Sequence, residues 1–372
     1  MKVSSETGVS MPIKNLISIV GAVAVGVWAY FGVIERIGKL ETDNHLIKKD
    51  LEKAVEFSIK WPRGELGSLP ADSEQFLLIE DALKDIEERR KVLYENVQKM
   101  KAIFPPSPNV FRENHFTERK EGGRSLKLRS YRPIDKKGVL PCLYYIHGGG
   151  MIMGSVENDD VNASRLSEDL GVVVISVDYR LAPEDPHPAQ INDCYEGLLW
   201  IESQKENLQI DSSKIVLYGQ SAGGGLVIAT SMMVRDKGGP KIAFQMPIYP
   251  MLDDRHETPS SHEITDIGIW DREGSIEAWK WYLGGKEADA YAAPSRAVSL
   301  EGLPPTFIDV GELDLFRDEN IHFAQRLLQA GVTTEFHLYP GAYHASENFA
   351  PDADLSKIIW NNRLKALSKA FE

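Results

Sequence analysis

The stretch K-I-V-L-Y-G-Q-S-A-G-G-G-L, residues 214–226, decides the fold of this chain. Its apolar first half predicts a strand, and the small residues that follow predict a sharp turn at Ser221 that leads directly into a helix. Gly219 and Gly223 allow such a turn, and the amino terminus of the helix favours developing negative charge. G-x-S-x-G in this setting is typical of a nucleophilic serine, which we favour over a structural glycine turn.

Apolar runs of strand length lie on both sides of this stretch, and helix-like segments separate them. Nearly all-apolar strands that alternate with helices predict a mostly parallel sheet covered on both faces. Two segments flanking E-G-G-R at 121–124 predict a hairpin of antiparallel edge strands. We therefore expect an α/β fold with a sheet of about eight strands. The strands predicted after the hairpin are 142–147, 172–179, 214–219, 242–250, 305–311 and 335–341.

A second glycine-rich turn follows the predicted strand at 142–147. It reads His147-Gly148-Gly149-Gly150. Glycines have no Cβ and let backbone N–H groups approach a substrate closely, as the oxyanion of an acyl-transfer intermediate requires. Alone, the motif could be a flexible turn. Because the serine turn follows it in the chain, we predict an oxyanion hole that includes these glycines and the N–H of Ala222.

A nucleophilic serine needs a base, and His344 is the candidate among the nine histidines of the chain. It lies just past the last predicted strand and near the end of the chain, as expected where the order is serine, acid, histidine. His187, His262 and His322 lie in other contexts. The alternative for His344 is a surface histidine with no role.

The orienting acid is predicted from the segment after the strand at 305–311, which offers Glu312, Asp314 and Asp318. Asp318 begins a predicted helix and is explained as its amino-terminal cap. Asp309 lies inside the strand. The loop just past a strand end is where an acid can reach a histidine ring, so we choose Asp314 over Glu312.

Composition excludes some classes of function. The 372 residues carry a formal net charge of −13, which argues against nucleic-acid binding, because neutralising phosphates requires clustered Lys and Arg. The two cysteines, Cys142 and Cys194, lie in apolar surroundings and predict no disulfide framework. No histidine lies at ligand spacing from them, so we predict neither a metal site nor a cofactor.

The first hundred residues differ from the rest. Residues 16–34 form an uncharged apolar run of 34 − 16 + 1 = 19 residues, long enough to cross a bilayer as a helix. We predict a membrane anchor of undetermined orientation; a signal peptide and a packed helix of a cytoplasmic protein are the alternatives. The expected division is a hydrophobic segment at 1–40, a helical cap or short coiled coil at 41–104, and a catalytic domain at 105–372.

Within the helical region, apolar residues recur at steps of three and four, with Arg90 as the one polar member of the series. Such a stripe must bury one face, either against the enzyme or in a coiled coil. Pro105 and the prolines after it end this helix. The apolar members are Ile79, Leu83, Ile86, Leu93, Val97 and Met100.

Together these features resemble the hormone-sensitive-lipase-like esterases, the bacterial family IV of the α/β hydrolases. The resemblance covers roughly 105–372 and consists of six motifs in the family's order. They are HGGG at 147–150, DYRLAPEDPHPA at 178–189, GQSAGGG at 219–225, YPMLDDR at 249–255, GELDLFRDE at 311–319 and PGAYH at 340–344.

The resemblance implies a carboxylesterase that hydrolyses short- to medium-chain acyl esters through an acyl-enzyme intermediate. It assigns the acid to Asp314 and the oxyanion donors to Gly149, Gly150 and Ala222. The sequence departs from the family at Gln220, where Asp is usual, and at Leu315, where Pro is common. Neither position supplies the nucleophile or the acid.

Other functions stay open at this point. An amidase or deacetylase would use the same three residues, and a membrane scaffold could carry an accessory hydrolase domain. Residues 256–285, with Trp270, Trp279 and Trp281, could shape the substrate pocket or form the core of a cap. The expected partner is a small ester, and a homo-oligomer is an open alternative to a monomer.

Overall fold

The computed structural model describes residues 71–117, 125–265 and 268–372, and Leu78–Glu372 form one compact unit. The described residues contain an eight-stranded sheet in the order β1-β2-β4-β3-β5-β6-β7-β8. Its strands are β1 (Val110–Thr117), β2 (Leu126–Pro133), β3 (Leu140–Ile146), β4 (Val173–Asp178), β5 (Ile210–Gln220), β6 (Ile242–Ile248), β7 (Thr306–Leu313) and β8 (Thr334–Tyr343). Pairings that involve β2 are antiparallel and the others are parallel, which confirms the predicted α/β sheet and its hairpin.

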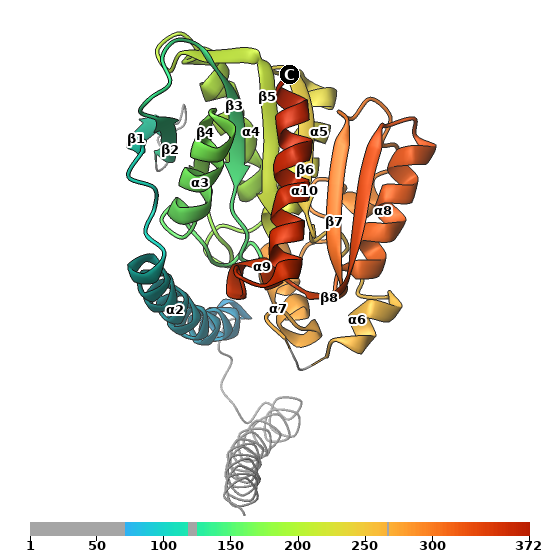
Figure 1. The fold of residues 1–372 in the computed structure, drawn as a ribbon. Helices are drawn as coiled ribbons and strands as arrows, with labels where there is room; N and C mark the ends of the chain where they lie inside the picture. Colours follow the sequence, from blue (N-terminus) through green and yellow to red (C-terminus); the bar gives the residue numbers. More distant parts are fainter. Residues whose placement is uncertain (1–70, 118–124, 266–267) are drawn as a thin grey trace, which may run out of the picture. The chain divides into compact units, whose positions relative to one another are not determined.

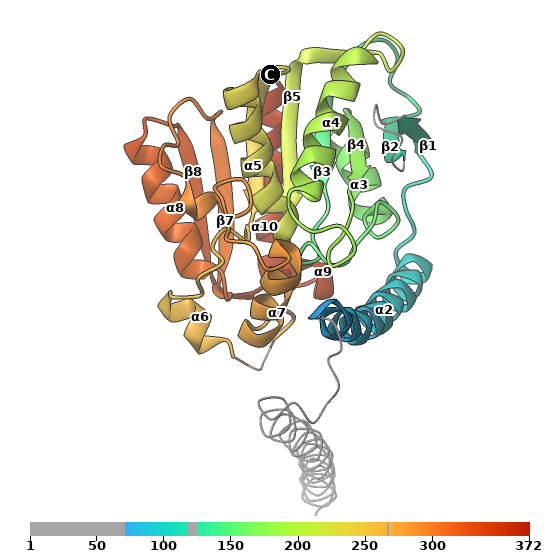
Figure 2. The ribbon, with the colours of Figure 1, turned by 180° about the vertical axis from the view of Figure 1, so that it is seen from behind.

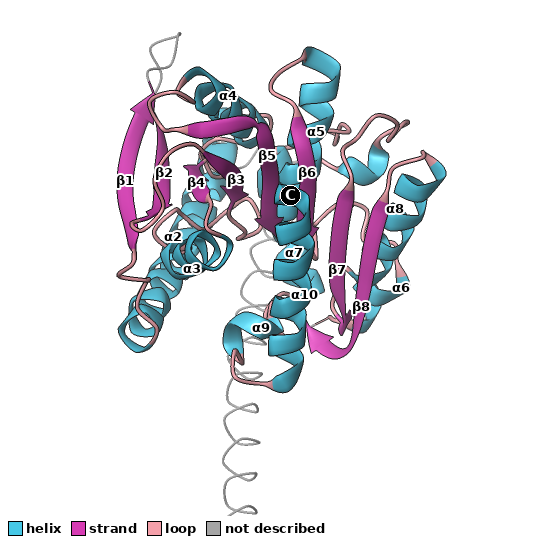
Figure 3. Cartoon of the chain, turned by 45° about the horizontal axis from the view of Figure 1, so that its top comes forward, coloured by secondary structure: helices cyan, strands magenta, loops and turns pink. Residues whose placement is uncertain are grey.

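Helices cover both faces of the sheet (Figures 1 and 2). One face carries α3 (Asp160–Leu170) and α10 (Asp354–Phe371), and the other carries α4 (Ala189–Ser203), α5 (Ala222–Lys237) and α8 (Arg317–Gln329). Figure 3 shows the same layers with the top of Figure 1 tilted forward. The remaining helical segments are α2 (Ala71–Ile103), α6 (Pro259–Glu263), α7 (Arg272–Leu283), η2 (Pro294–Arg296) and α9 (Ser346–Phe349).

Each face of the sheet has its own apolar core. Leu166 of α3 and Leu367 of α10 pack with the side chains of one face, whereas Leu198 of α4 and Leu226 of α5 pack with those of the other. Strands covered on both faces expose few polar positions, which explains their nearly continuous apolar sequences.

The α2 helix packs against the hydrolase unit through its stripe. Ile86 is fully buried in the core, and Arg90 donates hydrogen bonds to the carbonyl oxygens of Ile152 (2.7 Å) and Ala182 (2.9 Å). The helix ends at Ile103, two residues before Pro105, the first of the prolines that predicted its end. The polar residue of the stripe therefore satisfies backbone acceptors of the enzyme.

The predicted apolar run at 16–34 lies outside the described residues. Within 71–117, 125–265 and 268–372, no helix is long and apolar enough to cross a membrane.

Candidate active site

The register of the strands brings the sequence motifs together at the carboxyl ends of the parallel strands. Ile146, the last residue of β3, pairs with Gly219 of the adjacent parallel strand β5. The glycine turn after β3 and the serine turn after β5 therefore begin at the same level. Likewise Leu313, the last residue of β7, pairs with Tyr343, the last residue of β8. Asp314 and His344 are the next residues along the chain.

Ser221 occupies a strained turn between β5 and α5. Its backbone has a positive φ of 55° together with a ψ of −121°, a conformation that L residues rarely adopt. A Cβ on Gly223 would lie 2.1 Å from the carbonyl oxygen of Ile146, so only glycine fits where the helix passes β3. Strain of this kind is common at functional sites, and here it holds the hydroxyl group at the end of the sheet.

Ser221, His344 and Asp314 form one hydrogen-bonded chain. The Ser221 hydroxyl lies 3.0 Å from Nε2 of His344, whose Nδ1 lies 2.9 Å from Oδ2 of Asp314. The other carboxylate oxygen of Asp314 accepts from the backbone N–H of Phe316 (2.9 Å). All three side chains are buried, and the rings of Tyr249 and Phe316 pack against the histidine ring in T-shaped arrangements. The imidazole is thus held between a hydroxyl and a fixed carboxylate.

The neighbouring acids have other partners. Glu312 is exposed and accepts from the backbone N–H of Gly341 (2.9 Å). The prediction that Asp318 caps α8 is wrong, because the capping position is Phe316 and Asp318 lies in the first helical turn. Its carboxylate instead accepts from the backbone N–H of Ser260 (2.7 Å) and pairs with Arg317. Asp314 is therefore the acid that reaches His344.

The loop after β3 lies directly against the serine turn. A Cβ on Gly148 would lie 2.8 Å from the backbone oxygen of Gln220. Gly149 and Gly150 have φ values of +116° and +63°, and a Cβ on Gly149 would lie 2.1 Å from the carbonyl oxygen of Met153. Gly148 and Gly149 are thus required by the close approach of backbone, and Gly150 is required by its positive φ and by the ring of Trp270, whereas Ala222 follows Ser221 at the start of α5.

His147 anchors this loop. Its ring stacks on Tyr179 at 4.0 Å, and its Nδ1 donates to the carbonyl oxygen of Gly148 (2.8 Å). The Tyr179 hydroxyl donates to the carbonyl oxygen of His147 (2.8 Å). Burial lowers the pKa of His147, so the ring is neutral at pH 7. It serves as a rigid support for the glycines.

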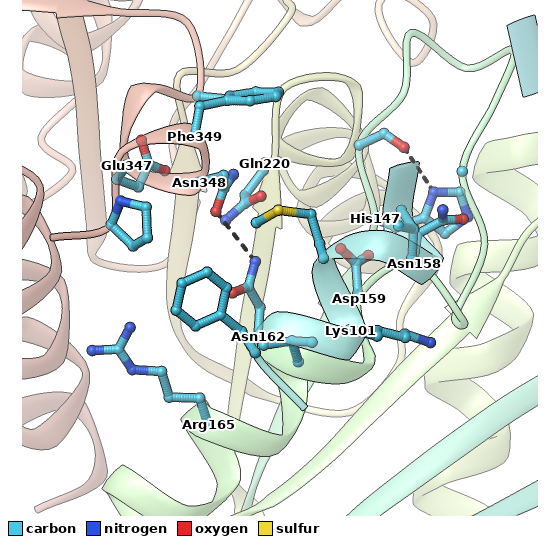
Figure 4. A pocket seen from close by; sticks show the side chains of 18 of the residues that line it. Lys101, His147, Asn158, Asp159, Asn162, Arg165, Gln220, Glu347, Asn348 and Phe349 are labelled. Atoms are coloured by element: carbon cyan, nitrogen blue, oxygen red, sulfur yellow. Dashed lines mark hydrogen bonds between the residues drawn. The ribbon is translucent and has the colours of Figure 1, made fainter. Parts of the chain in front are cut away.

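Ser221 and His344 line a cavity of about 900 Å³. Figure 4 shows other side chains of its wall. Its walls come from α2, the loop after β3, the start of α3, α9 and α10. Of the three tryptophans in 256–285, Trp270 lines this cavity, and its ring would contact a Cβ placed on Gly150. Trp279 is instead buried in the core. Of the two alternatives for this segment, shaping the pocket applies to Trp270 and packing in the core applies to Trp279.

Two features of the cavity wall escaped the sequence analysis. Asp159 faces the cavity (Figure 4), and its Oδ2 is buried without a hydrogen-bond partner. Burial raises the pKa of Asp159 to about 7, which the hydroxyl of Tyr145 partly opposes. Glu347 also lines the cavity, and it accepts hydrogen bonds from Tyr249 (2.7 Å) and Arg363 (2.6 Å).

No group of three or more His, Cys, Asp or Glu side chains suited to a metal ion occurs in the part of the chain that the structure describes. Cys142 and Cys194 are free and buried, and burial raises the pKa of both thiols. Their predicted role as small apolar residues agrees with this.

A buried serine–histidine–aspartate chain at the carboxyl ends of a mostly parallel sheet defines a protein of the α/β-hydrolase class. A family model described as alpha/beta hydrolase fold matches residues 143–348. The chain belongs to this family, in the hormone-sensitive-lipase-like group that its motifs resemble.

Named relatives agree with this placement. Carboxylesterase NlhH of Mycobacterium tuberculosis (strain ATCC 25618 / H37Rv) is 34% identical over 257 residues, which cover 68% of this chain and 80% of that protein. Esterase LipI of the same strain is 34% identical over 232 residues, 61% of this chain and 72% of that protein. The solved structure of a bacterial heroin esterase has a TM-score of 0.75 and 39% identity, and it matches 78% of this chain and 93% of that chain.

Proposed function

We propose that this protein is a serine carboxylesterase with Ser221 as nucleophile, His344 as general base and Asp314 as orienting acid. The observation that carries the proposal is the pair of hydrogen bonds from His344, 3.0 Å to the Ser221 hydroxyl and 2.9 Å to Asp314. The relatives named as carboxylesterase and esterase support the reaction class.

In the proposed mechanism, His344 takes the proton of Ser221 as the oxygen attacks the ester carbonyl. Asp314 holds the imidazole in the required tautomer and stabilises its cation. Backbone N–H groups of Gly149, Gly150 and Ala222 then bind the oxyanion, with Gly148 holding the loop against Gln220. His344 returns the proton to the leaving alcohol, and water releases the acyl group from Ser221.

The proposed substrates are esters with short to medium acyl chains. Relatives named arylesterase and ethyl acetate hydrolase, 35% and 29% identical to this chain, support that range. A cavity of about 900 Å³ holds a small ester with both its acyl and alcohol parts.

The test is turnover of a series of aryl esters by the Ser221→Ala variant. We expect the rate to fall by about 10³-fold or more with unchanged thermal stability, because only the nucleophilic oxygen is lost. Ser231→Ala is the matched control, since Ser231 is a buried serine of α5 whose hydroxyl has no hydrogen-bond partner. Near-normal turnover by Ser221→Ala would refute the assignment, and faster cleavage of a matched anilide would favour an amidase.

We further propose that residues 16–34 attach the protein to a membrane. The length and lack of charge of this run support the proposal. Fractionation of cells that express the full chain tests it: the protein should resist extraction by salt and carbonate and dissolve in detergent. Recovery of the untreated full chain in the soluble fraction would contradict attachment.

A further inference from the structure

The mouth of the active-site cavity is ringed by apolar side chains that are exposed to solvent. They come from three separate places in the sequence: the end of α2, the segment before α7, and the end of α9. Each lines the cavity and is also exposed, which places it where the cavity opens to solvent. We call this set the apolar rim; it consists of Met100 (39% exposed), Ile103 (67%), Phe104 (40%), Ile269 (47%) and Phe349 (58%).

The rim differs from the deep part of the same cavity. Ser221 and His344 are 8% and 6% exposed, so a substrate passes the rim before it reaches the nucleophile. Single exposed apolar residues need no explanation, but an apolar group gathered from three segments around one opening marks a surface that binds something. The apolar rim forms this surface, and it is also the entrance through which substrate reaches Ser221.

Charge indicates which partner this surface fits. The ionisable Asp, Glu, Lys and Arg side chains that line the cavity balance three against three, namely Lys101, Arg165 and Lys357 against Asp159, Glu168 and Glu347. The whole chain carries a formal charge of −13, which repels an anionic surface. The rim therefore fits a surface without net charge, such as a zwitterionic one, which it would contact through its apolar side chains.

The chain that precedes α2 supplies the reason for a lipid surface. The apolar run ends at residue 34 and the described chain begins at residue 71, so 70 − 34 = 36 residues connect them. A connection of this length spans at most about 120–130 Å. If the run lies in a bilayer, this connection keeps the hydrolase unit, and with it the rim, within a limited distance of that bilayer, which raises the effective concentration of the rim at the membrane surface.

We infer that the apolar rim inserts into the surface of a zwitterionic bilayer, and that lipophilic esters dissolved in the bilayer enter the cavity directly across it. The inference rests on the proposed esterase function for its substrate and on the proposed anchor for its location. The contact itself can be measured independently of both.

The contact is tested on the full chain reconstituted into phosphatidylcholine vesicles. Because Cys142 and Cys194 are fully buried, a single introduced cysteine can be labelled with an environment-sensitive fluorophore. We expect the label on Ile103→Cys to shift to the blue and to be quenched by lipids that carry a quencher in the acyl chain. The label on Ile134→Cys is the control, since Ile134 is 62% exposed but does not line the cavity. Equal, weak quenching at both positions would overturn the inference, whatever the activity.

Entry of substrate is tested by the ratio of two rates, on an ester embedded in the vesicles and on a water-soluble aryl acetate. The triple variant Ile103→Ser, Phe104→Ser, Phe349→Ser should lower this ratio at least tenfold. The control variant Ile134→Ser, Val298→Ser removes exposed apolar side chains that do not line the cavity and should leave the ratio unchanged. An unchanged ratio in the triple variant would overturn entry across the rim, whereas loss of both rates in the unmodified chain would count against the esterase proposal.

A second copy of the chain is the alternative occupant of the rim. Sedimentation of the detergent-solubilised full chain distinguishes it. If the unmodified chain is a dimer that the triple variant dissociates, the rim is a protein interface and the lipid inference fails.

Discussion

At the scale of single residues, the site depends on where two strands end. Asp314 and His344 each follow the last residue of their strand, and β7 and β8 are paired at those residues. The side chains of Asp314 and His344 therefore lie next to each other, and no long loop has to become ordered to bring them together. Glu312, two residues earlier, bonds instead to the backbone of Gly341. A separation of two residues decides which carboxylate serves the histidine.

We therefore predict a large loss of activity for one conservative change in this segment and almost no loss for another. Asp314→Asn should lower kcat/KM for a soluble aryl ester by about 10³–10⁴-fold, because the amide cannot hold the imidazole in the required tautomer or stabilise its cation. Glu312→Gln should stay within about threefold of the unmodified enzyme, since it loses only a surface hydrogen bond. Steady-state kinetics on both variants decides the matter, and a larger loss in Glu312→Gln would reassign the acid.

Asp159 gives a prediction about pH. Its pKa in the folded protein, raised to about 7 by burial, lies above the value of about 3.9 for an unfolded chain. Ionisation of Asp159 is thus less favourable in the folded state than in the unfolded chain. As pH rises from about 4 to about 7, this carboxyl group lowers the free energy of unfolding. Asparagine resembles the protonated acid. Asp159→Asn should gain stability over the unmodified protein, with the gain growing by about 1–3 kcal/mol between pH 4 and pH 8.

Asp160 is the matched control for this measurement because its pKa shifts in the opposite direction. Burial alone would raise the pKa of Asp160, but hydrogen bonds from Lys101, Arg129 and Tyr131 lower it. Its stabilising contribution is present above its unfolded pKa and is lost as pH falls through the folded value. Asp160→Asn should therefore lose stability most at neutral pH. Urea unfolding at a series of pH values measures both, and parallel curves for the two variants would contradict the assignment.

At the scale of elements, the last helix is fastened to the sheet by a buried charge. Arg363 of α10 is 2% exposed; it donates to both carboxylate oxygens of Asp309 on β7 (2.7 and 3.0 Å) and to Glu347 on α9 (2.6 Å). Glu347 in turn accepts from Tyr249, whose ring packs edge-on against His344. The helix thus supports the wall of the active site.

Removing this guanidinium should cost more stability than removing an exposed one. Arg363→Met leaves two buried carboxylates without a counter-charge, and we expect a loss of about 3–5 kcal/mol in the free energy of unfolding. Arg165→Met, which breaks an exposed pair with Asp169 and a cation–π contact with the ring of Trp360, should cost under about 1.5 kcal/mol. The triple change Asp309→Asn, Glu347→Gln, Arg363→Met should recover part of the loss. Denaturant unfolding tests this, and equal losses in the two single variants would contradict it.

Sequence patterns predicted the strands and the helices that separate them because each had its own signal. Period and turn chemistry located the strands, the hairpin and the end of α2, and the serine turn predicted the helix after it. The buried network had a weaker signal: Arg363 interrupts the apolar series Ile359 and Leu367 of α10, as Arg90 does in α2. Asp159 had no such signal, because residues of other elements bury its carboxyl group. Long-range pairing of charges depends on tertiary contacts that spacing along one element does not reveal.

At the scale of the whole molecule, the question is where the enzyme begins. The resemblance to the family begins near Pro105, its first motif lies at 147–150, and the family model begins at residue 143. Yet Ile86 is fully buried in the core, and Leu93 and Val97 line the active-site cavity. The second half of α2 therefore behaves as a part of the hydrolase unit, and its contacts lie outside the segment in which sequence similarity is strong.

Two truncations separate these boundaries. A chain that begins at Ala71 keeps Ile86 and Arg90, and we expect it to hydrolyse a soluble aryl ester within about threefold of the full-length rate. A chain that begins at Pro105 uncovers the site of a fully buried isoleucine, leaves two backbone acceptors without Arg90 and opens one wall of the cavity. It should lose at least about 2–5 kcal/mol of stability and most of its turnover. Arg90→Ala in the full chain reports the share of the hydrogen bonds in that loss. Thermal unfolding and ester kinetics on all three proteins provide the comparison, and a chain from Pro105 that matches the chain from Ala71 in both would place α2 outside the enzyme.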